Sequence, residues 1–300
     1  MIEQEYMIKI ENLQKKFGKK EVLRGIDLKI KKGEFYGVFG KNGMGKSTLF
    51  KHILGIEKPT KGNVFIADEE SKKQKKVSIG YLPENVSLYG YLSVEDNLKV
   101  AALSAGFEMN RRQREEALEK VNLVGSNHMK AANLSLGMKR RLQFAMATMT
   151  KPVDILILDE PTNGMDVNGV LWLKKYLEEL KQEQVTILTC SHSLNIMEDL
   201  IDRYCIIEHG KIIKENDWTR ERKSEFIVYY QQQWNDTEIK LIQKIAKVKR
   251  IFDNKIILEA SCNILELSEY MLKNNLKATD IDKRKQGLEE IFVESVMKND

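Results

Sequence analysis

The sequence predicts an α/β protein built around a parallel β-sheet, and two features of the chain predict it. Continuous apolar runs at residues 35–39, 155–158, 185–190 and 204–207 suit strands that are covered on both faces. An amphipathic stretch at residues 167–182, with the spacing of a helix, separates two of these runs. Because strands that alternate with helices form parallel sheets, we expect these runs to share one core sheet.

Other segments complete the expected fold. Residues 7–31 predict an antiparallel strand pair at one edge of the sheet, and residues 93–150, which are nearly free of strand signals, predict a helical subdomain. The composition changes after residue 215, where an aromatic- and glutamine-rich stretch at 218–234 is expected to be helical and further strand and helix patterns follow. We therefore expect a large domain of residues 1–215 and a small α+β accessory domain of residues 216–300.

A glycine-rich loop stands between the first buried run and a helical pattern. It fits G-x-x-x-x-G-K-[ST], in which backbone N–H groups face a phosphate chain, a lysine faces the β- and γ-phosphates and a hydroxyl ligates Mg²⁺. The residues predicted to hold the nucleotide are Gly40, Lys41, Asn42, Gly43, Met44, Gly45, Lys46, Ser47 and Thr48. The alternative, a glycine-rich turn without a ligand, is disfavoured because the full motif lies between strand and helix. The loop therefore predicts a P-loop NTPase core.

Two acidic residues, Asp159 and Glu160, end the apolar run at 155–158. Open α/β sheets bind their ligands at the carboxyl edge of the strands, where these acids would lie. Asp159 would hold Mg²⁺ together with Ser47, and Glu160 could be the general base for the water that attacks the γ-phosphorus. Acidic residues at a strand end are usually solvated and without a function. Because the chain also has Lys46 in a phosphate loop, we expect these two acids to form the second half of the nucleotide site.

Residues 134–138, Leu-Ser-Leu-Gly-Met, resemble the signature sequence of ABC-transporter ATPases, whose usual form is Leu-Ser-Gly-Gly-Gln. Further markers stand in that family's order. Residues 81–84 are similar to its Q-loop, residues 161–166 to the segment entering its D-loop, and residues 190–192 to its H-loop. The resemblance covers about residues 7–215.

This resemblance implies a subunit that binds ATP and Mg²⁺, hydrolyses ATP and works as a dimer. His192 would contact the γ-phosphate and orient the attacking water, and Phe17 would stack on adenine, although it could equally be a core aromatic beside a turn. Ser135 and Gly137 of one protomer would complete the nucleotide site of the other. Closing and reopening of the dimer would drive separate transmembrane permease subunits, in contact with residues 84–91.

Two departures from the family pattern point to a subfamily. Glu84 stands where the Q-loop has a glutamine, and Leu136 where the signature has a glycine. With the basic residues 139–141, these changes resemble the ATPase subunits of bacitracin-type and lantibiotic self-immunity exporters. Glu84 would still offer an oxygen to Mg²⁺, but it adds negative charge and donates no hydrogen bond. The resemblance thus implies self-immunity to a lantibiotic or a related antimicrobial peptide.

Composition and charge argue against a nucleic-acid-binding protein, a disulfide- or metal-stabilised protein and a membrane-spanning protein. The net charge is only +5, and the most basic run, residues 72–76, has no interleaved aromatic residues, so a solvated loop tip explains it better than nucleic-acid binding. The cysteines at 190, 205 and 262 have neither disulfide nor metal spacing. No apolar run approaches the ~18 residues of a spanning helix, and the acidic N-terminus is no signal peptide. We expect a peripheral protein on the cytoplasmic face of the membrane, which meets the membrane only through the permease.

The alternative to an exporter subunit is a soluble ABC-type ATP switch protein that works without a permease. Translation factors of that kind commonly carry two ATPase cassettes in one chain, and this chain has a single set of motifs. The accessory domain carries no catalytic signature, so we expect it to dock or to regulate.

Overall fold

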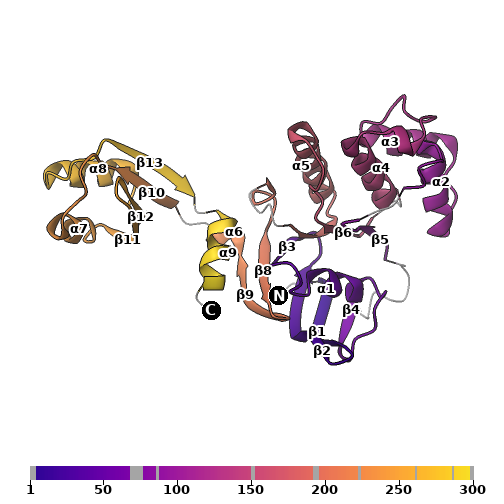
Figure 1. Ribbon diagram of the computed structural model, residues 1–300, viewed down its shortest axis with the longest axis horizontal. Helices are drawn as coiled ribbons and strands as arrows, with labels where there is room; N and C mark the ends of the chain where they lie inside the picture. Colours follow the sequence, from indigo (N-terminus) through magenta and orange to yellow (C-terminus); the bar gives the residue numbers. More distant parts are fainter. Residues whose placement is uncertain are drawn as a thin grey trace. The chain divides into compact units, whose positions relative to one another are not determined.

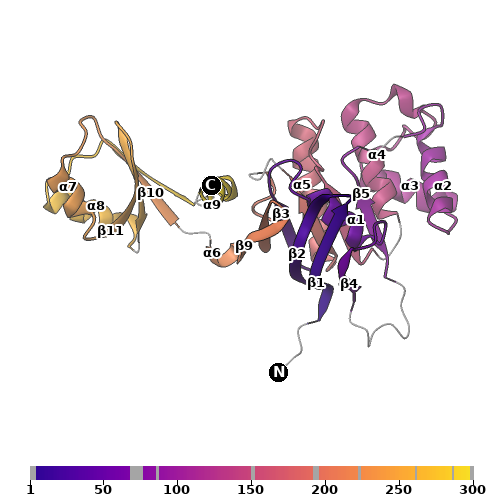
Figure 2. The same cartoon turned by 60° about the horizontal axis from the view of Figure 1, so that its bottom comes forward.

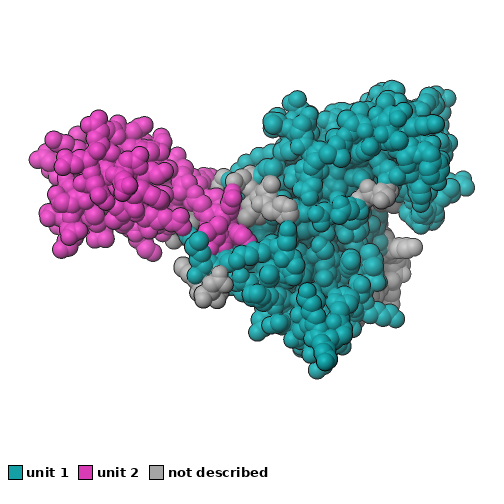
Figure 3. All heavy atoms as spheres, viewed as in Figure 1, with its two compact units in different colours: residues 1–217, 294–300 teal, residues 218–293 magenta. Residues whose placement is uncertain are grey.

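The computed structural model describes residues 5–67, 77–85, 88–149, 153–191, 196–221, 224–260, 262–285 and 287–297. The chain falls into two compact units, coloured separately in Figure 3: residues 1–217 with 294–300, and residues 218–293. Each unit has its own sheets and its own hydrophobic cluster. The division after Asp217 lies close to the boundary expected after residue 215.

The first unit is built on a six-stranded sheet with the order β5-β6-β7-β3-β8-β9 (Figure 1). Its strands are β3 (Phe35–Phe39), β5 (Ile79–Leu82), β6 (Ile155–Asp159), β7 (Thr186–Cys190), β8 (Arg203–Glu208) and β9 (Lys211–Asp217). Every residue of β3, β6 and β7 is buried, as uninterrupted apolar runs require. Strand β9 pairs antiparallel with β8, while the other pairings are parallel. The α/β fold expected from the sequence is confirmed.

A second, antiparallel sheet of this unit has the order β2-β1-β4. Its strands are β1 (Tyr6–Phe17), β2 (Lys20–Lys31) and β4 (Lys61–Ile66). The strand pair expected over residues 7–31 is therefore present, and β4 joins it as a third strand. Ile10 and Leu23 of this sheet share a hydrophobic cluster with Val38 of β3 and Phe50 of α1 (Lys46–Ile53), so helix α1 packs with both sheets (Figure 2).

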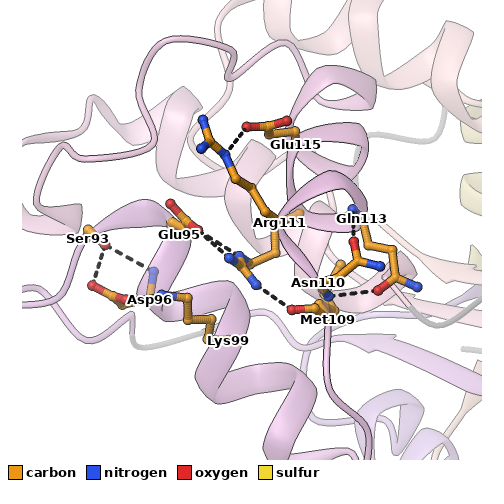
Figure 4. A network of polar contacts seen from close by, with 10 residues as sticks. Ser93, Glu95, Asp96, Lys99, Met109, Asn110, Arg111, Gln113 and Glu115 are labelled. Atoms are coloured by element: carbon orange, nitrogen blue, oxygen red, sulfur yellow. Dashed lines mark hydrogen bonds and ion pairs between the residues drawn. The ribbon is translucent and has the colours of Figure 1, made fainter.

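The described residues 88–149 form the helical subdomain expected from the sequence. Its elements are α2 (Val94–Ser104), α3 (Arg111–Lys120), the 3-10 turn η2 (Ala131–Asn133) and α4 (Leu136–Thr148). Local capping explains where two of the helices begin: the Ser93 side chain accepts from the Asp96 N–H, and Asn110 and Gln113 form a reciprocal capping box (Figure 4). Arg114 Nε donates to Glu95 Oε1 at 2.7 Å and so joins α3 to α2.

Helix α5 (Val167–Gln182) follows β6 and begins at an Asp166 cap. It buries an apolar stripe that includes Leu173 and Leu177, which is why its sequence is amphipathic. The Tyr176 hydroxyl lies 2.6 Å from Thr148 Oγ1 and so ties α5 to the end of α4. In the parts of the chain that the structure describes, no helix has both the length and the apolar composition needed to cross a bilayer.

The second unit is an α+β fold around an antiparallel sheet with the order β11-β12-β10-β13. Its elements are α6 (Trp218–Glu221), β10 (Ser224–Tyr229), α7 (Asp236–Ile242), β11 (Ala246–Ile251), β12 (Lys255–Ala260), α8 (Ile264–Lys273), β13 (Asp280–Lys285) and α9 (Leu288–Met297), the last of which continues into the first unit. Phe226 and Leu258 of the sheet cluster with Ile242 of α7 and Leu267 of α8. Both helices therefore contribute to the core of this unit.

The expectation of one helical stretch over residues 218–234 is wrong. The structure has a single short turn of helix, α6, followed by the strand β10. Within β10 and just after it, Phe226, Val228 and Tyr230 are buried in the core at every second position. That spacing belongs to a strand, and aromatic and β-branched residues favour one.

Candidate nucleotide site

The phosphate loop connects β3 to α1, and two of its glycines fit where no other residue would. Gly45 caps α1 with a left-handed backbone (φ 107°), and a Cβ there would lie 2.8 Å from Leu23 Cδ2. A Cβ on Gly40 would lie 2.4 Å from the carbonyl oxygen of Ile207. The glycines therefore allow the loop to lie closely against β2 and the end of β8.

Lys46 is the first residue of α1, and its ammonium group turns back over the loop. Its Nζ donates to the carbonyl oxygens of Gly40 at 2.6 Å and of Lys41 at 3.2 Å, and the residue is only 6% exposed. An ammonium has three N–H donors, more than these two carbonyls use. Met44 faces another way, since its sulfur accepts the N–H of His209 at 3.2 Å.

A cavity of about 500 Å³ brings the two halves of the expected site together. Its walls include Asn42, Gly43, Gly45, Lys46, Ser47 and Thr48 of the loop, together with Glu84, Asp159 and Glu160. Lys20 and Val22 also line it, although no motif of the sequence marks them. They come from β2, which the fold brings beside the loop. Lysines, hydroxyls and carboxylates thus share one space, a combination that suits the binding of a nucleotide with Mg²⁺.

Asp159 is 4% exposed and lies at the end of β6. Cys190, at the end of the neighbouring strand β7, donates its thiol to Asp159 Oδ1 at 2.8 Å. Burial, with the Asp159 charge as a further cause, raises the pKa of Cys190, so the thiol stays protonated and remains a donor. Burial, followed by the same carboxylate, also raises the pKa of Tyr81 to about 12.

Glu160 is 3% exposed and has a left-handed backbone, with φ 48°. Such a conformation costs a non-glycine residue on the order of 1–3 kcal/mol and is found most often at functional sites. Backbone contacts hold the residue there: its N–H donates to the Cys190 carbonyl at 2.9 Å, and its carbonyl accepts from Arg140 Nη2 at 2.7 Å and from the Asn163 N–H at 3.2 Å. In this conformation Glu160 lies in the wall of the cavity.

Ser135 and Gly137 do not line this cavity. Ser135 is exposed and caps α4, its Oγ accepting from the Met138 N–H at 3.2 Å. Leu136 between them is also exposed, at 64%. The signature segment thus presents a helix N-terminus to the surface rather than to the nucleotide cavity of the same chain.

The sequence analysis also assigns Phe17 and His192 to the nucleotide site. Phe17 is 47% exposed at the end of β1, is not among the residues that line the cavity, and has Lys15 Nζ 4.7 Å above its ring. His192 lies outside the described residues. Arg140, which was expected only as part of a basic run, is instead buried beside the site, a placement that its sequence neighbours do not indicate.

Comparisons with known proteins identify the family of the chain. The family described as "ABC transporter" matches residues 23–163. The chain is 37% identical over 212 residues to the lantibiotic transport ATP-binding protein SrtF of Streptococcus pyogenes, covering 71% of this chain and 91% of SrtF. It is 32% identical over 308 residues to the bacitracin transport ATP-binding protein BcrA of Enterococcus faecalis, covering 97% of each.

Solved structures give the same family. The dimeric post-hydrolysis structure of the ATP-binding cassette MJ0796, bound to ADP and Pi, has a TM-score of 0.62 and 25% identity, and the match covers 71% of this chain and 99% of that one. Relatives of this similarity, matched along most of their length, show what the chain is: it belongs to the ATP-hydrolysing subunits of ABC transporters.

Proposed function

We propose that this chain hydrolyses ATP in the cavity between the phosphate loop and β6, and that it powers an exporter conferring self-immunity to lantibiotics or related antimicrobial peptides. The observation that carries the chemistry is the meeting of Lys46, Asp159 and Glu160 in one cavity. The peptide class is supported by the likeness to proteins named for lantibiotic and bacitracin transport, and by Glu84 in the Q-loop position.

The loop binds the triphosphate in this proposal. Backbone N–H groups of residues 40–48 and the N-terminus of α1 favour negative charge. The Lys46 ammonium exchanges its carbonyl partners for the β- and γ-phosphate oxygens. Phe17, half-exposed and flat, is available to stack on adenine.

Ser47 and Asp159 would hold Mg²⁺, with Glu84 as a further oxygen ligand, and all three line the cavity. Their hydroxyl and carboxylate oxygens suit this hard cation. Bound there, Mg²⁺ would neutralise charge on the phosphates. The Cys190 thiol donates to one Asp159 oxygen, Oδ1, and so helps to orient the carboxylate.

Glu160 is the proposed general base. Its carboxylate accepts a proton from the attacking water while the γ-phosphoryl group leaves ADP, and His192, two positions after Cys190 in the sequence, orients that water. The backbone contacts of Glu160 keep the base fixed before the substrate arrives, which lowers the reorganisation needed for reaction.

A second copy of the chain completes each site. Ser135 and Gly137 lie at the exposed N-terminus of α4, away from the cavity of their own protomer, so their contact with a γ-phosphate needs a partner. Two ATP molecules would then lie between two protomers. Their binding closes the dimer, and hydrolysis reopens it.

Separate permease subunits turn this cycle into transport and hold the chain at the cytoplasmic face of the membrane. Their contact surface is proposed around residues 84–91, where Tyr89 and Tyr91 are exposed and Glu84 lines the cavity. Exposed aromatic residues are common anchors in protein interfaces.

The test is peptide tolerance in a sensitive bacterium that expresses the chain with its permease subunits. We expect the parental pair to raise tolerance to a lantibiotic or to bacitracin, and Lys46→Ala to abolish the gain. Lys51→Ala is the matched control, because Lys51 is an exposed lysine on the same helix. If no peptide of this class is tolerated better with the parental pair than without it, the self-immunity proposal is wrong.

A further inference from the structure

Arg140 is a buried charge that the proposed reaction does not use. It lies on α4, one turn after the helix begins at Ser135, and is 5% exposed. A buried guanidinium is stable only when its donors are satisfied. Burial lowers the pKa of Arg140, while the nearby carboxylates of Asp159, Glu84 and Glu160 oppose that effect and keep the group charged.

The guanidinium contacts backbone carbonyls from two separate segments. Nη1 reaches Pro83 and Glu84 at 3.3 and 3.4 Å, while Nε reaches Pro161 at 3.1 Å and Nη2 reaches Asp159 and Glu160 at 3.3 and 2.7 Å. Gln143, one turn further along α4, orients the group by accepting from Nη1 at 3.1 Å. One side chain therefore spans the segments that supply all three carboxylates of the cavity.

The shortest of these contacts is made to the residue whose backbone is strained. Arg140 donates to the carbonyl of Glu160, which has a left-handed backbone and lines the cavity. Without that donor, the carbonyl keeps only the longer contact with the Asn163 N–H at 3.2 Å, so the strained backbone is held less tightly and the position of Glu160 can shift. A misplacement of about 1 Å at a reacting group can cost on the order of 100-fold in rate.

The same side chain is fixed to the helix that carries the signature segment. Because α4 is one continuous helix from Leu136 to Thr148, a movement of its N-terminus also moves Arg140. Its contacts then carry the movement to Glu84 on one side and to Glu160 on the other.

We propose that Arg140 is a positioning residue, which fixes the orientation of Glu160 and links it to the Glu84 segment. Through α4, it makes hydrolysis in one nucleotide cavity depend on what the Ser135 end of the same helix contacts in the other. The positioning role rests on the contacts above, and the coupling rests on the proposed dimer.

The experiment compares ATP hydrolysis by the parental protein and by Arg140→Lys. A lysine keeps the charge but cannot span two segments with a planar fork of donors. We expect kcat to fall about 10- to 100-fold while KM for ATP changes by less than about twofold, and the Hill coefficient for ATP to fall towards 1. A variant whose defect was merely structural would lose ATP affinity and thermal stability together with kcat.

Arg141→Lys is the matched control, because Arg141 is the next residue on α4 and packs over the Trp172 ring at 5.0 Å instead of reaching the site. It should keep the parental kcat and Hill coefficient. Gln143→Met is a milder variant for the event that Arg140→Lys does not fold, and it should lower kcat in the same direction by a smaller factor.

An unchanged kcat in folded Arg140→Lys overturns the positioning role, as does an equal loss in Arg141→Lys. A reduced kcat with an unchanged Hill coefficient overturns the coupling alone. If the parental protein itself hydrolyses ATP without cooperativity, the proposed dimer fails and the coupling with it, while kcat still decides the positioning role.

Discussion

At the scale of single residues, the site depends on how the chain holds its two buried acids. Asp159 receives a thiol donor from the neighbouring strand, and Glu160 receives backbone contacts on both sides of a left-handed residue. Both acids line the cavity, where the proposed reaction brings the metal and the water.

Glu160→Gln should keep ATP binding and lose most of the turnover, because an amide cannot accept the proton of the attacking water. We expect kcat to fall about 10²- to 10⁴-fold with little change in the affinity for ATP, measured by steady-state hydrolysis and equilibrium binding. Lys46→Ala provides the contrast, since it should weaken binding itself. Parental turnover in the glutamine variant would rule out Glu160 as the base.

The three cysteines should differ in reactivity. Cys190 and Cys205 are buried, and burial raises the pKa of Cys205 to about 12, far above assay pH, so the reactive thiolate is scarce. Cys262 is partly exposed. At pH 8, iodoacetamide should modify Cys262 alone in the native protein and all three after unfolding in guanidinium, as seen by mass spectrometry. Rapid native labelling of Cys190 would contradict its buried contact with Asp159.

A residue's role can be predicted from the sequence when it depends on a short motif, and cannot when it depends on contacts between distant parts of the chain. The loop could be predicted because its whole motif, Gly40 to Thr48, lies within one short segment. The role of Arg140 could not, because its acceptors lie about 20 and 57 positions away and only the folded chain brings them together. Lys20 and Val22 escaped prediction for the same reason.

At the scale of helices and strands, the buried parallel strands were the most predictable elements. Their apolar runs, such as the one that became β6, have a single physical explanation, which is coverage on both faces. Strand β10 was mistaken for helix because it is short, and a glutamine-rich segment follows it. The place of β4 beside β1 could not be predicted, since pairing between distant strands is not written in either strand alone.

A buried ion network holds the sheet of the second unit. Glu225 of β10 is 1% exposed, with Lys249 Nζ 2.7 Å from one carboxylate oxygen and Arg284 Nη2 3.0 Å from the other. Lys249 belongs to β11 and Arg284 to β13, so the acid connects the two edges of the sheet. Its removal would take the shared acid from both cations, of which Arg284 keeps its pair with Glu290.

Glu225→Gln should therefore destabilise the second unit by about 1–3 kcal/mol. This is less than the loss expected from breaking a fully buried ion pair, because both cations are partly exposed. Hydrogen exchange of β10 and β12 in the full chain measures this as faster opening. Glu269→Gln is the control: its pair with Lys273 is exposed, so the change should stay within about 0.5 kcal/mol. Equal exchange rates in the two variants would deny the network a structural role.

At the scale of the whole molecule, the chain carries two half-sites that do not meet. The cavity presents the loop and the acids, while the exposed N-terminus of α4 presents Ser135 and Gly137 elsewhere on the surface. In a two-fold dimer, the cavity of each protomer can meet the α4 N-terminus of its partner, which gives two equal contacts. The central claim is that ATP is bound between two copies of this chain.

The measurement that tests this claim most directly is the molar mass and nucleotide content of Glu160→Gln with ATP and Mg²⁺, by size exclusion with light scattering. We predict a dimer with one ATP per chain, which returns to monomer with ADP. Ser135→Arg, added to the same chain, places a bulky cation at the helix N-terminus and should give a monomer that still carries ATP. A Glu160→Gln protein that remains monomeric at saturating ATP, or a dimer that persists with Ser135→Arg, would contradict the claim.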